Sequence, residues 1–321
     1  TLLHLPHENP RHANRMQRAA IALLLHALYC HVNKCATHLG VAYEPRRLLL
    51  LGKPGAGKSF VAKVLILLTR MVLNEQGAAA GGAPTGVAAF EAGVKTWHSF
   101  LRIPVGSKFS TSFDGLGASG ELQQKLAPLF MLLGDELSMS GRTLFGWIAH
   151  QTRTGIANGH GNNEPFGGPK LPFVVMSGDF HQLDPVFDSP VYKPGSASAN
   201  SNYGRQAYLM FGDVILLEEV VRQHESQVKL RTMLDSMRDG AGATGYDMEF
   251  VKSRRLPQLA ASERRLFEED GHGTLWVFYT HEKAWARNRA VLERRNLAVP
   301  VVKVRARNNG SHARRAIAKD F

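Results

Sequence analysis

The fold of this chain is decided by the stretch Leu48-Leu49-Leu50-Leu51-Gly52-Lys53-Pro54-Gly55-Ala56-Gly57-Lys58-Ser59. Four leucines without a polar interruption predict a strand that is buried on both faces, as in a parallel sheet. The glycines that follow allow a tight loop whose backbone N–H groups point inward. The apolar residues 59–68 then predict a helix whose positive N-terminus faces that loop.

This order of strand, glycine-rich loop and helix contains the phosphate-binding pattern G-x-x-x-x-G-K-[ST]. In that pattern Lys58 reaches the β- and γ-phosphates of a nucleotide, and the hydroxyl of Ser59 holds Mg²⁺. A glycine-rich turn that binds nothing is the alternative, and the strand before the loop and the helix after it argue against it. The sequence therefore predicts a P-loop NTPase. The loop residues expected to surround the phosphates are Gly52, Pro54, Gly55, Ala56 and Gly57.

The composition is that of an ordinary soluble globular protein, with 44% hydrophobic and 21% charged residues. Its 321 residues suffice for one large α/β domain and part of a second. The formal charge of +12 at pH 7 favours a polyanionic partner, either nucleic acid or an anionic membrane surface. Charge alone leaves the partner open, because a run of basic residues is often only a solvated face.

Two cysteines are too few to frame a secreted fold of this length, so we expect a reducing, intracellular compartment. No apolar run reaches the length of a membrane span, and no membrane partner is expected. Cys30, His31, Cys35 and His38 lie close together in the sequence, but their spacing matches no common zinc pattern. Metal binding there is the minor alternative to packing of the cysteines as small core residues.

Strands that alternate with helices and are apolar throughout predict an α/β fold with a doubly wound parallel sheet. A helix is expected to begin at Asn14. A second core strand is expected at 77–82, although that run of alanine and glycine is a poor strand former. Further buried strands are expected at 128–134, 172–177, 214–217 and 275–279, the last followed by a helix over 284–292.

The same pattern divides the chain into three parts. Residues 1–13 are predicted to be a flexible arm, and residues 14–215 a first domain. A Gly/Ser-rich excursion at about 103–122 interrupts this domain and is typical of an insertion. The composition changes near 211–223, so residues 216–321 are predicted to begin a second domain.

Polar residues follow the ends of the later strands, where a parallel sheet places its functional groups. Asp135 and Glu136 directly follow the strand 128–134. One carboxylate there can hold Mg²⁺ through the water molecules of the ion, and the next can polarise the water that attacks the phosphate. A pair of surface acids is the alternative, which the apolar run before them disfavours. Gln182 could hydrogen-bond the γ-phosphate, and Arg222 could reach the charge of the transition state. Taken alone, a loop glutamine means little, and an isolated arginine is more often in a surface salt bridge.

Several stretches in a fixed order resemble the motifs of the PIF-type (petite integration frequency) DNA helicases, which belong to superfamily one and are related to RecD. The resemblance runs from about residue 14 to residue 321 and covers the N-terminal part of such an enzyme. It implies a RecA-like first domain and a second RecA-like domain that is incomplete, because the late motifs of the family do not follow before Phe321. The stretches are 52–59, 83–89, 96–100, 134–139, 165–168, 178–183 and 217–223.

The resemblance implies an ATP-driven motor that moves 5′ to 3′ on single-stranded DNA and unwinds forked duplex DNA. It would act as a monomer, in the nucleus or a mitochondrion if the source is eukaryotic. In the family's pattern Asp135 holds Mg²⁺, Glu136 is the catalytic base, and Gln182 senses the γ-phosphate. Arg222 is the arginine finger. Gln17 resembles the glutamine that reads adenine, although a glutamine on a helix surface fits nearly as well.

The same resemblance places Pro84, Thr85, His98 and Phe100 where the family contacts DNA, with ring faces stacking on bases. The excursion at 103–122 corresponds to the wedge that splits the duplex. We therefore expect the N-terminal fragment of an ATP-dependent DNA helicase, with ATP and Mg²⁺ as cofactors. Two alternatives remain open. One is a P-loop ATPase of the AAA type, whose finger comes from a neighbouring subunit, and the other is a non-enzymatic basic module that binds single-stranded DNA by charge.

Overall fold

The computed structural model describes residues 13–35, 37–38, 41–42, 44–104, 120–157, 164–195, 198–222, 227–238, 240, 244–268 and 275–294. The chain divides into two compact units, Thr1–Arg231 and Thr232–Phe321, and each is described here by itself. The predicted arm at 1–13 and the predicted wedge at 103–122 lie almost wholly outside the described residues, so both stay predictions. The predicted domain boundary at 215/216 also stays a prediction.

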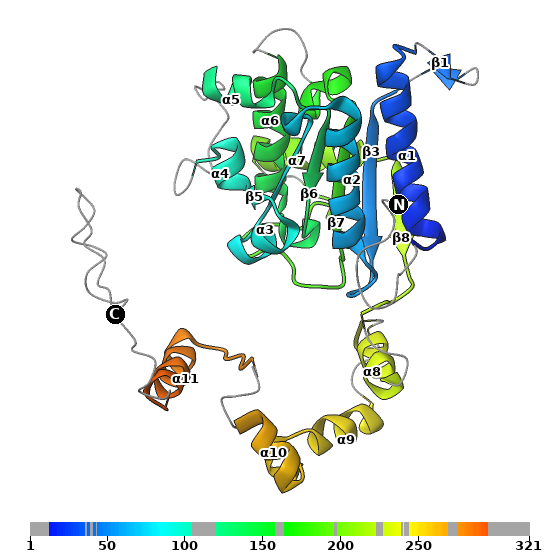
Figure 1. Ribbon diagram of the computed structural model, residues 1–321. Helices are drawn as coiled ribbons and strands as arrows, with labels where there is room; N and C mark the ends of the chain where they lie inside the picture. The colour runs from blue at the N-terminus through cyan, green and yellow to red at the C-terminus, as the bar shows by residue number, and fades with distance from the viewer. Residues whose placement is uncertain are drawn as a thin grey trace, which may run out of the picture. The chain divides into compact units, whose positions relative to one another are not determined.

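A parallel sheet of six strands forms the centre of the first unit (Figure 1). The strands follow the order β5-β4-β6-β7-β3-β8, and every neighbouring pair is parallel. The strand that precedes the phosphate-binding loop is β3, an interior strand between β7 and β8. This arrangement confirms the predicted doubly wound parallel sheet. The strands are β3 (Arg46–Gly52), β4 (Ala79–Ala83), β5 (Lys95–Thr96), β6 (Met131–Gly134), β7 (Phe173–Gly178) and β8 (Asp213–Leu217).

Helices cover both faces of this sheet (Figure 1). Leu48 and Leu50 of β3 pack into one core with α1 (Arg15–Val32) and α2 (Lys58–Leu73). Leu49 lies in the second core, on the opposite face. The leucine run is therefore buried on both sides, and each such side chain contributes about 2 kcal/mol of hydrophobic free energy. The second core is built from α4 (Trp97–Leu101), α5 (Gly120–Leu126), α6 (Arg142–Ala157) and α7 (Ala199–Leu209).

β4 consists of alanine and glycine, yet it lies inside the sheet between β5 and β6. The reason is the indole of Trp97, which is only 1% exposed: a Cβ added to Gly82 would lie 2.5 Å from its Cδ2. A Cβ added to Gly81 would meet the backbone of Leu133 in the neighbouring strand. The expected second core strand is confirmed, and its unusual composition leaves room for the ring.

A buried arginine fastens the segment before β7 to the start of β3. Arg47 donates hydrogen bonds to the carbonyl oxygens of Gly168 (2.9 Å) and Leu171 (3.0 Å). The short helix η4 (Pro165–Lys170) contains non-helical backbone, with Phe166 at φ 60°. The arginine therefore stabilises an irregular turn by adding donors to its carbonyls, and the Gly168 carbonyl also accepts the N–H of Leu171 at 3.3 Å. The remaining elements of the first unit are the antiparallel pair β1 (Thr37–His38) and β2 (Val41–Ala42), α3 (Gly86–Ala92), η1 (Gln76–Ala78) and η3 (Leu137–Met139).

The described residues of the second unit form helices and no strand. The strand predicted at 275–279 is therefore wrong: these residues pair with no strand in the part of the chain that the structure describes, and Leu275, Val277 and Tyr279 are almost fully exposed. Its RecA-like character stays a prediction. Among the described helices, none is both long enough and apolar enough to cross a membrane. The helices are α8 (Val228–Arg238), which spans the division between the units, α9 (Gly245–Ser253), η5 (Leu256–Gln258), α10 (Ala261–Glu268) and α11 (His281–Arg294).

Candidate nucleotide-binding site

The predicted catalytic groups all follow the carboxyl end of a strand. Because the strands are parallel, these ends lie at one edge of the sheet. β3 ends at Gly52, where the phosphate-binding loop begins, and β6 ends at Gly134, just before Asp135 and Glu136. Only β7 separates these two strands. The fold therefore brings the predicted phosphate cradle and the predicted acidic pair to the same edge.

The phosphate-binding loop has the backbone that the pattern requires. Gly55 and Gly57 have φ values of 81° and 87°, a region that glycine enters without strain. α2 begins directly afterwards at Lys58, so its first N–H groups face the loop. The Lys58 Nζ donates to the carbonyl oxygens of Gly52 (2.8 Å) and Lys53 (3.2 Å), and it would exchange these bonds for phosphate oxygens.

Gln17 lies against the loop from the N-terminus of α1. Its Nε2 donates to the carbonyl oxygen of Ala56 at 3.2 Å, and its Oε1 accepts the N–H of Asn14 in a capping box. A Cβ added to Gly57 would lie 2.5 Å from this Nε2. These bonds use one N–H and one lone pair of the amide, so its adenine-reading role stays a prediction. In the structure, Gln17 holds the phosphate-binding loop through its hydrogen bond to Ala56.

The acidic pair sits in a field of like charges. Glu136 has a left-handed backbone, φ 53°, and its N–H donates to Oδ1 of Asp135 at 3.0 Å. Burial raises the pKa of the Glu136 carboxyl, and the charge of Asp135 raises that pKa further. Lys58 opposes the rise, while Asp179 and Glu91 add smaller increases. Lys58 is thus close enough to act on Glu136, as a joint role at one phosphate requires.

Gln182 and Arg222 are both exposed at this edge of the sheet. Gln182 follows β7, and its N–H donates to the carbonyl oxygen of Asp179 at 3.0 Å. Arg222 follows β8, and the residue before it is tied to the loop: the N–H of Val221 donates to the carbonyl oxygen of Gly55 at 2.9 Å. Both residues are free of the core, and their roles as phosphate sensor and finger stay predictions.

The residues predicted to contact DNA differ in their exposure. Pro84 and Thr85 are half-buried at the end of β4, and Thr85 caps α3 by accepting the N–H of Ala88 at 3.2 Å. His98 is half-buried, and burial lowers its pKa. Phe100 is 3% exposed, and the ammonium of Lys125 lies 4.2 Å from its ring centroid. Its ring has no free face for a base, so we assign Phe100 to the core.

Two functional contacts were not anticipated from the sequence. Asp179 is buried at the end of β7, and its charge acts on Glu136. The sequence did carry a signal for it, because Gly178-Asp179 repeats the Gly134-Asp135 ending of a neighbouring apolar strand. The bond from Val221 to the loop carries no such signal, since it is made by a backbone group.

The donor groups at this edge fit a magnesium–nucleotide complex. Mg²⁺ takes one or two protein oxygens and completes its shell with phosphate and water. The exposed hydroxyl of Ser59, in the first turn of α2, and the buried carboxylate of Asp135 are such oxygens. Among the residues that the structure describes, no group of three or more His, Cys, Asp or Glu side chains could hold a metal by itself. This holds also for the described cysteines and histidines near the end of α1.

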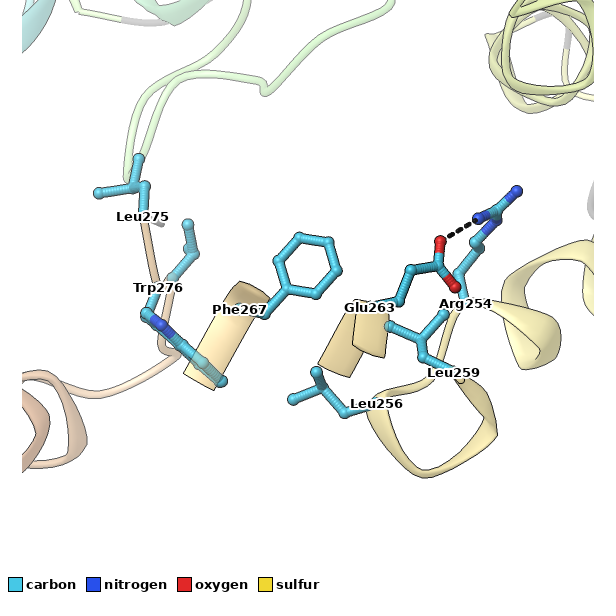
Figure 2. Close-up of a pocket in the computed structure, with 8 residues that line it drawn as sticks. Arg254, Leu256, Leu259, Glu263, Phe267, Leu275 and Trp276 are labelled. Atoms are coloured by element: carbon cyan, nitrogen blue, oxygen red, sulfur yellow. Dashed lines mark ion pairs between the residues drawn. The ribbon is translucent and has the colours of Figure 1, made fainter. Parts of the chain in front are cut away.

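The second unit has a separate cavity of about 330 Å³, shown in Figure 2. Its lining is mainly apolar, and at one side Arg254 and Glu263 form an ion pair at 3.9 Å. None of the predicted site residues lines it. The only cationic side chain among the described residues of its lining is ion-paired, so we take the candidate nucleotide site to be the one in the first unit. The apolar lining includes Leu256, Leu259, Phe267 and Trp276.

A phosphate-binding loop at the carboxyl edge of an all-parallel sheet covered by helices defines a P-loop NTPase with a RecA-like fold. The chain belongs to the PIF1-like helicase family, whose sequence profile matches residues 31–243, more than half of its length. This confirms the resemblance drawn from the motifs. Among curated proteins, none matches the sequence.

Solved Pif1 structures share the fold. A structure of two coordinating Pif1 helicases at forked duplex DNA is 22% identical with a TM-score of 0.55, covering 78% of this chain and 53% of its own. Pif1 from Candida albicans is 21% identical with a TM-score of 0.55, covering 76% and 48%. A Bacteroides Pif1 complex with ADP-AlF3 and single-stranded DNA is 21% identical with a TM-score of 0.52, covering 88% and 58%. The chain therefore spans about half the length of these proteins.

Proposed function

We propose that this chain is the ATP-binding and catalytic portion of a DNA helicase that moves 5′ to 3′ on single-stranded DNA and opens forked duplexes. One observation carries the proposal: the phosphate-binding loop, the Asp135–Glu136 pair and the segment after β8 that contains Arg222 lie at one edge of one parallel sheet. The PIF1-like family supports helicase activity. The related structures that contain forked DNA or a nucleotide with single-stranded DNA support the substrates.

Each residue has a defined task in this proposal. The loop N–H groups and Lys58 bind the β- and γ-phosphates, and the N-terminus of α2 adds its positive potential. Ser59 and Asp135 would hold Mg²⁺, which would neutralise charge on the phosphates when bound. Glu136 accepts a proton from the attacking water, a step that its raised pKa favours near neutral pH.

The residues beyond β7 and β8 complete the site. Gln182 would bind the γ-phosphate and respond to its loss, and Arg222 would stabilise charge in the transition state. An arginine in that role contributes about 10³- to 10⁵-fold in rate. Pro84, Thr85 and His98 would contact the DNA strand, with Thr85 and backbone groups on phosphate.

The test separates binding from chemistry. Nucleotide binding and ATP hydrolysis are measured on the 321-residue chain, with and without single-stranded DNA. Lys58→Ala should lose both activities, whereas Glu136→Gln should bind ATP normally and hydrolyse it about 10²- to 10⁴-fold more slowly. Glu249→Gln, an exposed glutamate of the second unit, is the control. Unchanged turnover in Glu136→Gln would remove our assignment of the base.

The AAA-type alternative is tested by mixing two inactive variants, Lys58→Ala and Arg222→Ala. If the finger came from a neighbouring subunit, the mixture would contain one intact site and regain hydrolysis. The proposed helicase has its finger in the same chain, so the mixture should stay inactive. Arg265→Ala, which removes an exposed arginine elsewhere, serves as the control.

The charge of +12 favours the second alternative, a basic module that binds DNA without chemistry. Such a module would bind single-stranded DNA with a steep salt dependence that ATP and Lys58→Ala leave unchanged. The helicase proposal predicts that ATP analogues shift DNA affinity and that Lys58→Ala abolishes the shift.

A further inference from the structure

The last turn of α1 ends in a Schellman motif. Lys34 has a left-handed backbone, φ 50°, and its N–H donates to the carbonyl oxygen of His31 at 3.3 Å. The N–H of Cys35 donates to the carbonyl oxygen of Cys30 at 2.9 Å. These two bonds are the paired 5→2 and 6→1 bonds that define the motif. In it, the side chains at the two ends of the 6→1 bond are frequently in contact.

Here both of these positions are cysteines, and they are the only two in the 321 residues. The backbone of the motif places them at its C3 and C″ positions, whose side chains are neighbours. Cys30 is 1% exposed and lies 3.9 Å, from Sγ to Nε2, from His26 one turn earlier. Cys35 is half-buried, so one thiol of the pair is within reach of a small solute while the other is covered.

We propose that Cys30 and Cys35 are a redox modification site that forms a reversible intramolecular disulfide with a small-molecule disulfide such as oxidised glutathione. The motif fixes the backbone of both residues and makes their side chains neighbours, so a disulfide requires no unfolding of the helix. A pair of apolar residues would serve the motif equally well as packing. Two neighbouring thiols with unequal exposure have a further use, because the accessible one can attack a dissolved disulfide and the covered one can resolve the product.

The reaction proceeds in two exchanges. The Cys35 thiolate attacks one sulfur of oxidised glutathione, which forms a mixed disulfide and releases one glutathione thiolate. The Cys30 sulfur, after giving up its proton, then attacks Cys35 and releases the second glutathione. Two protein thiols are oxidised, and one glutathione disulfide is reduced to two thiols. Burial raises the pKa of the Cys30 thiol, which suits it to the second step rather than the first.

The site is independent of the nucleotide proposal, because Gln17 contacts the phosphate-binding loop from the other end of α1. Trypsin makes it directly testable. Lys34 lies between the cysteines, so cleavage separates peptide 19–34 from peptide 35–46. The reduced native chain is incubated with oxidised glutathione, free thiols are blocked, and the digest is analysed with and without reductant.

We expect peptides 19–34 and 35–46 to be joined in the monomer and to separate on reduction. The same exchange in urea gives the reference, and the equilibrium constant for closure should be at least about tenfold larger in the native chain. Cys35→Ser should leave Cys30 unmodified in the native state. Stable glutathione on Cys35 alone, a link between two chains, or an equal closure constant in urea would overturn the proposal.

Discussion

The close approach of Trp97 to β4 makes Gly82→Ala a sharp test of the fold. A Cβ at position 82 would lie 2.5 Å from Cδ2 of the indole, whereas carbon atoms in contact are separated by about 3.5–4.0 Å. The ring would have to move by about 1 Å. It covers Gly134 of the next strand as well, where an added Cβ would lie 3.0 Å from Cζ2, and it is fully enclosed. We therefore place the cost at the upper end of overpacking, about 3 kcal/mol.

The measurement is urea unfolding followed by circular dichroism, with hydrogen exchange of β4 peptides to report on the first unit. Trp97→Leu alone should cost about 3 kcal/mol because it leaves a cavity. The double variant Gly82→Ala/Trp97→Leu should cost about 2 kcal/mol less than the sum, since the added methyl fills that space. Gly86→Ala is the matched control: its Cβ would meet nothing within 4 Å, and it should stabilise α3 by about 0.5 kcal/mol.

The outcome that refutes this reasoning is simple. If Gly82→Ala unfolds within about 0.5 kcal/mol of the unchanged chain, the indole does not confine the strand. Additive costs in the double variant would lead to the same conclusion, because they would show that the two residues do not interact.

Three further outcomes follow from the site and its supports. Burial raises the pKa of Glu136, and the catalytic base must be ionised to act. The value of kcat/KM for ATP should therefore fall on acidification with a pKa above about 4.3, the ordinary value for glutamate. A kcat/KM that stays constant down to that pH would contradict this. Val221→Pro removes the N–H that binds the Gly55 carbonyl and should weaken nucleotide binding about fivefold, whereas Val221→Ala keeps the N–H and should match the parent in a titration. Arg47→Met leaves the Leu171 carbonyl without its donor and removes one of the two donors to the Gly168 carbonyl, so it should cost about 1–3 kcal/mol in urea unfolding, with an unchanged nucleotide affinity below the transition because Arg47 is at the opposite end of β3.

Local patterns were sufficient where one signal dominated. The leucine run before Gly52 predicted a strand that is buried on both faces, because a strand with one solvent-facing side would alternate apolar and polar residues. The phosphate-binding loop followed from glycine positions that need a left-handed backbone. Asp135 and Glu136 followed from their place after a buried strand. These predictions depend on residues that are near one another in the sequence.

Other features depend on contacts between distant residues. The glycines of β4 are explained by contacts with residues later in the chain: Trp97 fills the space beside Gly82, and the backbone of Leu133 lies against Gly81. Phe100 was expected to face DNA, yet it packs in the second core under Lys125. Residues 275–279 alternate in burial like a strand, but strand formation requires a second strand, and none of the described residues pairs with them.

The hydrogen bonds that hold the phosphate-binding loop could not be predicted from the sequence, although the residues of the loop itself could. Two neighbouring segments hold its carbonyls: Gln17 of α1 binds Ala56, and Val221 beyond β8 binds Gly55. A nucleotide that changes the conformation of the loop must either lengthen these two hydrogen bonds or move the segments that make them. The second contact is adjacent to Arg222, in the segment through which the chain continues into the second unit. If a nucleotide reshapes the loop, the hydrogen bond from Val221 is the route by which the change would reach the residues nearest Arg222, and no side-chain motif encodes that bond.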